Sequence, residues 1–168
     1  MTEDSRPVPP PEVMADRLKE RIYATITMIS VVIGLSATDP GAPGALATVL
    51  TTGLGLWAAA FVADTQAHRV LYGRFARGRE LRRMLYVSSP LLSCAVGPGV
   101  MIALAELGVM SLPTALRTAA GVGIASLFLW GCFGGLRMGA GTVIALLAGL
   151  VDAVIGAAVA VVKATAGH

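Results

Sequence analysis

Apolar residues fill five long runs of this 168-residue chain, and short stretches rich in proline, glycine or charge separate them. A helix needs about 20 apolar residues to cross the hydrocarbon core of a bilayer. Because lipid offers no hydrogen-bond partners, each crossing segment satisfies its backbone polar groups within its own helix. The pattern therefore predicts an all-α, polytopic transmembrane bundle with five spans, at residues 22–37, 45–67, 85–110, 114–136 and 141–163.

The segment before the first span divides into two parts. Residues 1–11 are polar and proline-rich, which predicts a disordered tail ahead of a single transmembrane domain at residues 12–168. Apolar positions recur at helical spacing between Glu12 and Arg21. Two interpretations stay open for them: an amphipathic helix at the membrane surface, or the exposed first turns of the first span. Prolines and glycines between Asp39 and Gly44 predict the first turn between spans.

Composition narrows the class of protein. Hydrophobic residues make up 55% of the chain and charged residues 14%, against roughly 25% charged residues in ordinary globular domains. Five spans leave no room for a separate enzymatic domain, and no nucleophile–base pair or phosphate-binding loop is visible, so we expect no enzyme. The basic residues flank apolar spans and lack interleaved aromatics, which argues against nucleic-acid binding.

The positions of the positive charges predict the orientation. They gather in the N-terminal segment, in a basic loop at residues 68–84 and at Arg137. Positive residues are retained on the cytoplasmic side of a membrane. We therefore expect a multi-pass protein of the cell membrane with a cytoplasmic N-terminus and an external C-terminus. The arginines Arg77, Arg79, Arg82 and Arg83 are candidate contacts for anionic lipid or a soluble partner.

Small residues recur every fourth position in the last span. Gly149, Ala153 and Ala157 form one stripe, and Gly156 and Ala160 form another. Such stripes let helix backbones approach closely in lipid. They predict tight packing within the subunit or across the seam of a homodimer.

Ionisable groups inside a bilayer are costly and so call for an explanation. Asp152 lies near the centre of the fifth span, where it is interpreted either as a cation or proton ligand or as a hydrogen-bonded packing group. Asp64 lies near the cytoplasmic end of the second span, as a further candidate ligand or as a carboxylate at headgroup level. Glu106 and Arg117 flank the short turn between the third and fourth spans, and we expect them to form a structural ion pair.

The third span contains Gly97, Pro98 and Gly99 near its middle. A proline removes a backbone donor, so we expect a kink or a break there. Because Asp152 is expected at similar depth, the pair suggests a gated cation path; a packing kink is the alternative. Cys94 and Cys132 are interpreted as small apolar fillers rather than metal ligands.

Several segments resemble the vacuolar iron transporter family. Residues 21–23 lead into a Thr-rich first span, and the second span ends in the sequence ADTQAHR at residues 63–69. Residues 89–91 precede Gly97 and Pro98 in the third span. The family has five spans and a cytoplasmic N-terminus. The resemblance implies export of iron or manganese in exchange for protons, with Asp64 as a site residue.

The chain also departs from that family. Residues 24–28 read ATITM, where the family carries an aspartate, and a short arginine-rich loop replaces the family's acidic metal-binding insert. Two hypotheses follow. The first is a small secondary transporter, a homodimer that moves a divalent metal ion or protons, in which Asp64 and Asp152 are ligands assisted by Thr25 and Thr27; the metal is cargo, and no cofactor is expected. The second is a membrane scaffold without transport activity, whose arginine loop binds a partner.

Overall fold

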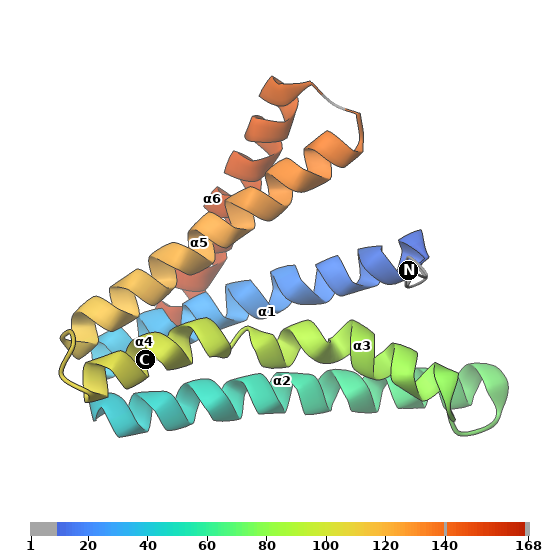
Figure 1. Cartoon of the computed structure of the whole chain (residues 1–168), viewed down its shortest axis with the longest axis horizontal. Coiled ribbons are helices and arrows are strands. Elements are labelled where there is room, and N and C mark those ends of the chain that lie inside the picture. Colours follow the sequence, from blue (N-terminus) through green and yellow to red (C-terminus); the bar gives the residue numbers. More distant parts are fainter. Residues whose placement is uncertain (1–9, 140, 167–168) are drawn as a thin grey trace, which may run out of the picture.

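The computed structural model describes residues 10–139 and 141–166 and is helical throughout, with no strand in those ranges (Figure 1). Its six helices are α1 (Pro11–Thr38), α2 (Gly41–Tyr72), α3 (Arg79–Ser93), α4 (Val96–Glu106), α5 (Leu112–Arg137) and α6 (Thr142–Ala166). Taken with α3 and α4 as one segment, the described residues form five helical segments long and apolar enough to cross a membrane. The prediction of an all-α protein with five candidate spans is confirmed.

The helices extend beyond the expected spans. Helix α1 begins at Pro11 and runs without interruption to Thr38, so residues 12–21 are the first turns of the spanning helix. The expected basic loop at residues 68–84 shrinks to residues 73–78, because α2 continues to Tyr72 and α3 begins at Arg79. Backbone hydrogen bonds continue along a helix regardless of where the hydrocarbon ends, so hydropathy alone misses these turns. The expected disordered tail falls, apart from its last two residues, outside the described residues.

The third segment breaks about one turn before the expected position. Helix α3 ends at Ser93 and α4 begins at Val96, so Pro98 lies in the first turn of α4. A proline has no N–H, and its ring clashes with the carbonyl four residues earlier, which here belongs to Cys94. The interruption therefore falls at residues 94–95, on the N-terminal side of the Gly97–Gly99 stretch.

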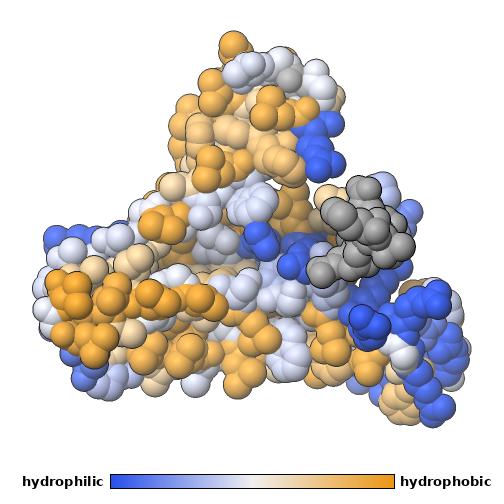
Figure 2. Space-filling model, viewed as in Figure 1, coloured by the Kyte–Doolittle hydropathy of each residue, from blue (hydrophilic) through white to orange (hydrophobic). Residues whose placement is uncertain are grey.

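Helix α1 is the centre of the arrangement and packs against α2, α3, α5 and α6. Helix α2 lies along α3 and α4, while α5 and α6 form a hairpin that leans away from the α2–α3 end (Figure 1). The main core cluster joins α1, α2, α4 and α5 through Met28, Val49, Ile102 and Leu116. Elsewhere the exterior is broadly apolar, as the orange areas of Figure 2 show, which suits a lipid surrounding.

Small residues bring the helices of the hairpin into close contact. A Cβ added at Gly131 would lie 2.7 Å from the Cα of Gly149, and one at Gly135 would lie 2.7 Å from the Cα of Ala145. The stripe residues Ala153 and Ala160 are buried. The expected close packing of the last span is confirmed within the subunit.

The two ends of the bundle differ in chemistry. The beginning of α1, the α2–α3 connection and the end of α5 lie toward one end, while the 39–40 and 107–111 turns lie at the other (Figure 1). At the first end, five arginines each cover an aromatic ring at 4.1–5.9 Å: Arg17 on Tyr86, Arg21 on Trp130, Arg69 on Phe75, Arg74 on Tyr72 and Arg137 on Phe133. About two such contacts are typical of a chain this long. This dense set of rings and guanidinium groups is suited to a membrane–water interface.

Candidate cation site

A polar hollow of about 480 Å³ opens at the arginine-rich end, between α1, α2 and α3. We call it the acidic hollow. Its charged and titratable lining consists of Asp16, Lys19, Glu20, Asp64, His68, Tyr72, Glu80 and Arg83. Four carboxylates and two cationic side chains thus line the hollow. Glu80 is paired with Arg74 from outside the lining, so the negative charge that favours a cation comes from Asp16, Glu20 and Asp64.

His68 is the most constrained polar group of the acidic hollow. Its side chain is only 6% exposed, and its Nε2 has no hydrogen-bond partner among the described residues. That nitrogen lies 3.5 Å from Glu80 Oε2, close enough for a charge pair but without hydrogen-bond geometry. The ring also packs against Tyr72, with 4.6 Å between ring centroids. A buried imidazole nitrogen without a partner is a candidate ligand, because burying an unsatisfied polar group costs free energy.

The carboxylates come together because α1 and α2 run antiparallel. The start of α1 therefore lies beside the end of α2, and Asp16, Lys19 and Glu20 all act electrostatically on Asp64. Lys19 Nζ lies 3.6 Å from Glu20 Oε1 and offsets part of the negative charge. Asp64 is half-buried. The sequence singled out Asp64 but missed Asp16 and Glu20, whose spacing of four residues on one helix face was the available signal.

A second hollow, of about 420 Å³, adjoins the acidic hollow and leads along the α1–α2 interface. The two share Lys19 and Glu20, and the second is otherwise lined by Tyr23 and by small or aliphatic residues. Thr27 follows Glu20 by seven residues, so both lie on one face of α1. Its Oγ1 is buried and has no hydrogen-bond partner among the described residues. Thr27 lines neither hollow, but its buried hydroxyl lies two helical turns beyond Glu20, toward the middle of the bundle.

The other expected ligand, Thr25, is placed differently. Its hydroxyl donates to the Arg21 carbonyl oxygen at 2.8 Å. Thr25 lines a separate cavity of about 190 Å³ beside the α3–α4 break, together with Met28, Cys94 and Met101. That cavity is largely apolar, so Thr25 and Thr27 do not share one site.

Asp152 is also remote from the acidic hollow. It lies in the α5–α6 interface, where its Oδ2 would be 2.6 Å from a Cβ at Gly131. The α3–α4 break packs near Gly123 of α5, eight residues from Gly131, which is roughly 12 Å along the helix. The sequence analysis placed Asp152 at the depth of the break and made it a ligand together with Asp64. In the structure Asp152 lies beside neither the break nor Asp64. The position of a residue within its own span does not reveal which neighbouring helix its side chain contacts.

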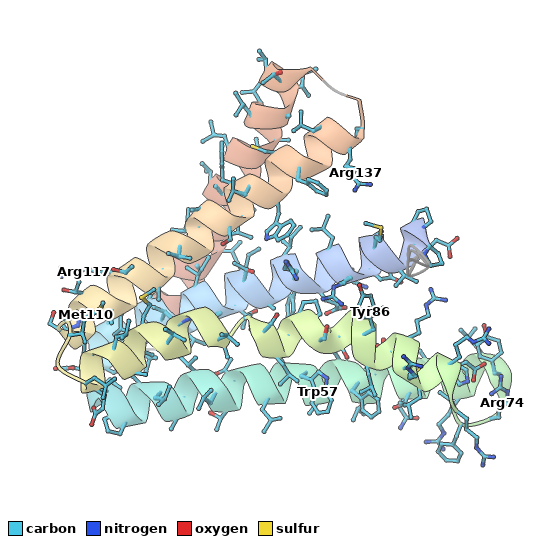
Figure 3. All side chains as sticks on the ribbon, in the orientation of Figure 1. Trp57, Arg74, Tyr86, Met110, Arg117 and Arg137 are labelled. Atoms are coloured by element: carbon cyan, nitrogen blue, oxygen red, sulfur yellow. The ribbon has the colours of Figure 1, made fainter. Side chains whose placement is uncertain are left out.

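The expected ion pair between Glu106 and Arg117 is not formed in the described structure. Both side chains are exposed, and Arg117 lies at the end of the bundle opposite Arg74 (Figure 3). Exposed charges gain little from pairing, because water solvates each one well and side-chain entropy is lost. Proximity to the same turn was not sufficient to join them.

The α2–α3 connection carries a real ion pair instead. Arg74 donates through Nη1 and Nη2 to the two oxygens of Glu80, at 2.8 and 2.6 Å. The hydrogen bond to Glu80 raises the pKa of Arg74 above its ordinary value. By contrast, Arg77, Arg79, Arg82 and Arg83 are exposed and form no ion pair with a described residue.

No group of three or more His, Cys, Asp or Glu side chains among the described residues is arranged closely enough to hold a metal ion. The acidic hollow thus presents dispersed carboxylates around one imidazole rather than a closed coordination shell.

Comparison with protein-family models, curated proteins and solved structures finds no match for this chain. The resemblance to the vacuolar iron transporter family therefore stays a prediction that rests on its short motifs.

Proposed function

We propose that this protein is a secondary transporter that moves a divalent metal ion across the cell membrane in exchange for protons. The observation that carries the proposal is the acidic hollow, whose lining combines carboxylates of α1, α2 and α3 with the buried Nε2 of His68, which has no hydrogen-bond partner among the described residues. Ionisable residues within membrane-spanning segments typically mark ion pathways, and Asp64 lies inside the candidate span Gly41–Tyr72. The distant resemblance to iron transporters agrees in substrate class.

In this proposal the arginine-rich end faces the cytoplasm, and the acidic hollow is the cytoplasmic entrance. A cation enters among Asp16, Glu20 and Asp64, then passes along the hollow that shares Glu20 toward Thr27. Asp152, which has no hydrogen bond or ion pair to a described residue, is assigned to the exchanged proton on a separate branch of the path. The α3–α4 break supplies the movable element. A homodimer is the expected assembly.

Reconstituted protein tests the proposal. Proteoliposomes with an internal metal-sensitive dye are exposed to Fe²⁺, Mn²⁺, Co²⁺ or Zn²⁺, and a pH dye reports counter-movement of protons. We expect metal entry well above that of empty vesicles, and at least a tenfold lower rate for Asp64→Asn. Glu106→Gln is the matched control, since it removes an exposed carboxylate at the opposite end. Wild-type flux equal to that of empty vesicles would overturn the proposal.

The alternative, a scaffold without transport activity, predicts a different result. Flux would be absent, while charge reversal at Arg77, Arg79, Arg82 and Arg83 would disrupt function in the cell. We favour transport because a scaffold gives no reason for several carboxylates and a buried imidazole to line one hollow.

A further inference from the structure

The corner where α2 meets α3 combines six arginines with exposed apolar side chains. We call it the arginine corner; its arginines are Arg69, Arg74, Arg77, Arg79, Arg82 and Arg83. Glu80 is the one acidic residue between positions 66 and 83. In Figure 2 hydrophilic residues gather over this corner, with apolar ones among them. Val70, Leu71, Tyr72 and Phe75 are each more than 60% exposed.

A pocket of about 360 Å³ lies in this corner, on the outside of α2. It is lined by Gln66, Arg69, Val70, Gly73, Arg74 and Phe75. Arg69 is held in place from two sides, because its guanidinium covers the Phe75 ring at 4.8 Å and its Nη1 donates to Gln66 Oε1 at 3.3 Å. Arg74 is fixed by Glu80. The pocket thus presents two oriented guanidinium groups beside apolar surface.

The length of α2 places this pocket at the level of the lipid headgroups. Its 32 residues extend roughly 48 Å, whereas a bilayer with its headgroup layers is about 40–45 Å thick. When the start of α2 lies in one headgroup layer, its last turn therefore lies in the other. Val70 and Phe75, which line this pocket and not the acidic hollow, then contact lipid, which explains their exposure. Arginine at this level meets phosphate groups.

We propose that this pocket binds the phosphate headgroup of an anionic phospholipid of the surrounding leaflet. Arg69 and Arg74 contact the phosphate, Gln66 contacts the polar headgroup substituent, and the apolar side chains pack against the upper acyl chains. The four arginines without an ion partner add a positive field that selects anionic over zwitterionic lipid. The inference does not depend on transport: of the acidic hollow it shares only Glu80, which positions Arg74, and Arg83, which adds to the positive field.

Native mass spectrometry of the detergent-purified full chain tests the proposal. The protein is titrated separately with phosphatidylglycerol, with phosphatidylcholine of the same acyl chains, and with glycerol 3-phosphate. We expect retained phosphatidylglycerol at concentrations where the other two leave no adduct. Arg69→Gln should weaken phosphatidylglycerol binding about fivefold, as should Arg79→Gln, since each arginine near an anionic surface contributes on that scale.

Arg117→Gln is the matched control, because it removes one exposed arginine at the opposite end of the bundle (Figure 3). Its affinity for phosphatidylglycerol should equal that of the wild type. Melting curves without added lipid identify a variant that is unfolded. If Arg69→Gln is unfolded, the phosphatidylglycerol affinity of Arg79→Gln, which changes an arginine outside the pocket, still tests the proposal. Equal retention of the two phospholipids, equal weakening by Arg117→Gln, or equal binding of glycerol 3-phosphate would each overturn the proposal.

Discussion

Arg17 Nη1 donates to the backbone oxygen of Tyr86 at 2.9 Å, and the same guanidinium covers the Tyr86 ring at 4.1 Å. In a regular helix that oxygen would accept from residue 90, but Pro90 has no N–H. Ser89 also donates to it, at 2.9 Å. The start of α1 is thus attached to α3 at a point where a proline has left an acceptor available.

This attachment predicts a measurable coupling. Arg17→Gln should lower the free energy of unfolding by roughly 1–2 kcal/mol, because a charged hydrogen bond and a cation–π contact are lost. In a Pro90→Ala background, residue 90 regains its N–H and can satisfy the Tyr86 oxygen within α3. The effect of Arg17→Gln should then shrink. Thermal unfolding in detergent measures the cycle, and additive effects of the two substitutions would contradict the proposed relation.

The α5–α6 contact makes a second prediction. Gly131→Ala places a methyl group 2.6 Å from Asp152 Oδ2 and 2.7 Å from the Gly149 Cα, where backbone cannot give way easily. Overpacking of this kind should destabilise the protein by about 1–3 kcal/mol. Gly134→Ala is the control on the same helix, since nothing lies within 4 Å of its added Cβ. Equal melting temperatures for the two variants would count against this packing.

The break between α3 and α4 leads to a prediction about Pro98. Pro98→Ala restores an N–H that can reach the Cys94 carbonyl, so α3 and α4 should join more continuously. Hydrogen–deuterium exchange of amides at residues 95–99 should slow, and metal flux should fall if the break is the movable element. Pro113→Ala, at the first turn of α5, removes a proline that costs no helical hydrogen bond and should change neither quantity. Unchanged exchange in Pro98→Ala would show that the proline does not maintain the break.

Asp152 allows its two interpretations to be separated. Under the transport proposal, Asp152→Asn keeps the side-chain shape and leaves the unfolding temperature unchanged, while proton counter-movement with metal falls at least tenfold. Under a packing role the reverse is expected: the melting temperature shifts and flux is retained. Parallel melting and proteoliposome assays on one preparation decide between them.

Much of the fold could be predicted from hydropathy and turn chemistry. The apolar runs located all five spans, and the prolines and glycines near Asp39 located the first turn. The errors concern helix ends, because hydropathy marks only the apolar part of a helix. Helix α1 begins at Pro11 and α2 ends at Tyr72, beyond the predicted spans, since intrahelical hydrogen bonds do not depend on lipid. The break lies at Cys94 rather than at Pro98, because a proline lacks an N–H and its ring clashes with the carbonyl four residues earlier.

The site was harder to predict because it is assembled from three helices. Asp64 stood out in a single span, whereas Asp16 and Glu20 resembled ordinary exposed charges until α1 lay against α2. Glu80 approaches His68 only because the connection at residues 73–78 is short. Asp152 was misplaced relative to the break, because it packs beside Gly131 of α5, roughly 12 Å along that helix from the residues near the break.

The interruption at Cys94 and Ala95 also bears on biosynthesis. Helix α4 has 11 residues, roughly 16 Å, or about half the thickness of the hydrocarbon. It cannot cross alone, so the insertion machinery must accept residues 79–106 as one segment of single-span length. Residues of α5 line the cavity beside the interruption. The ribosome makes α5 later, so the packing around the interruption is complete only after the fourth crossing has been synthesised.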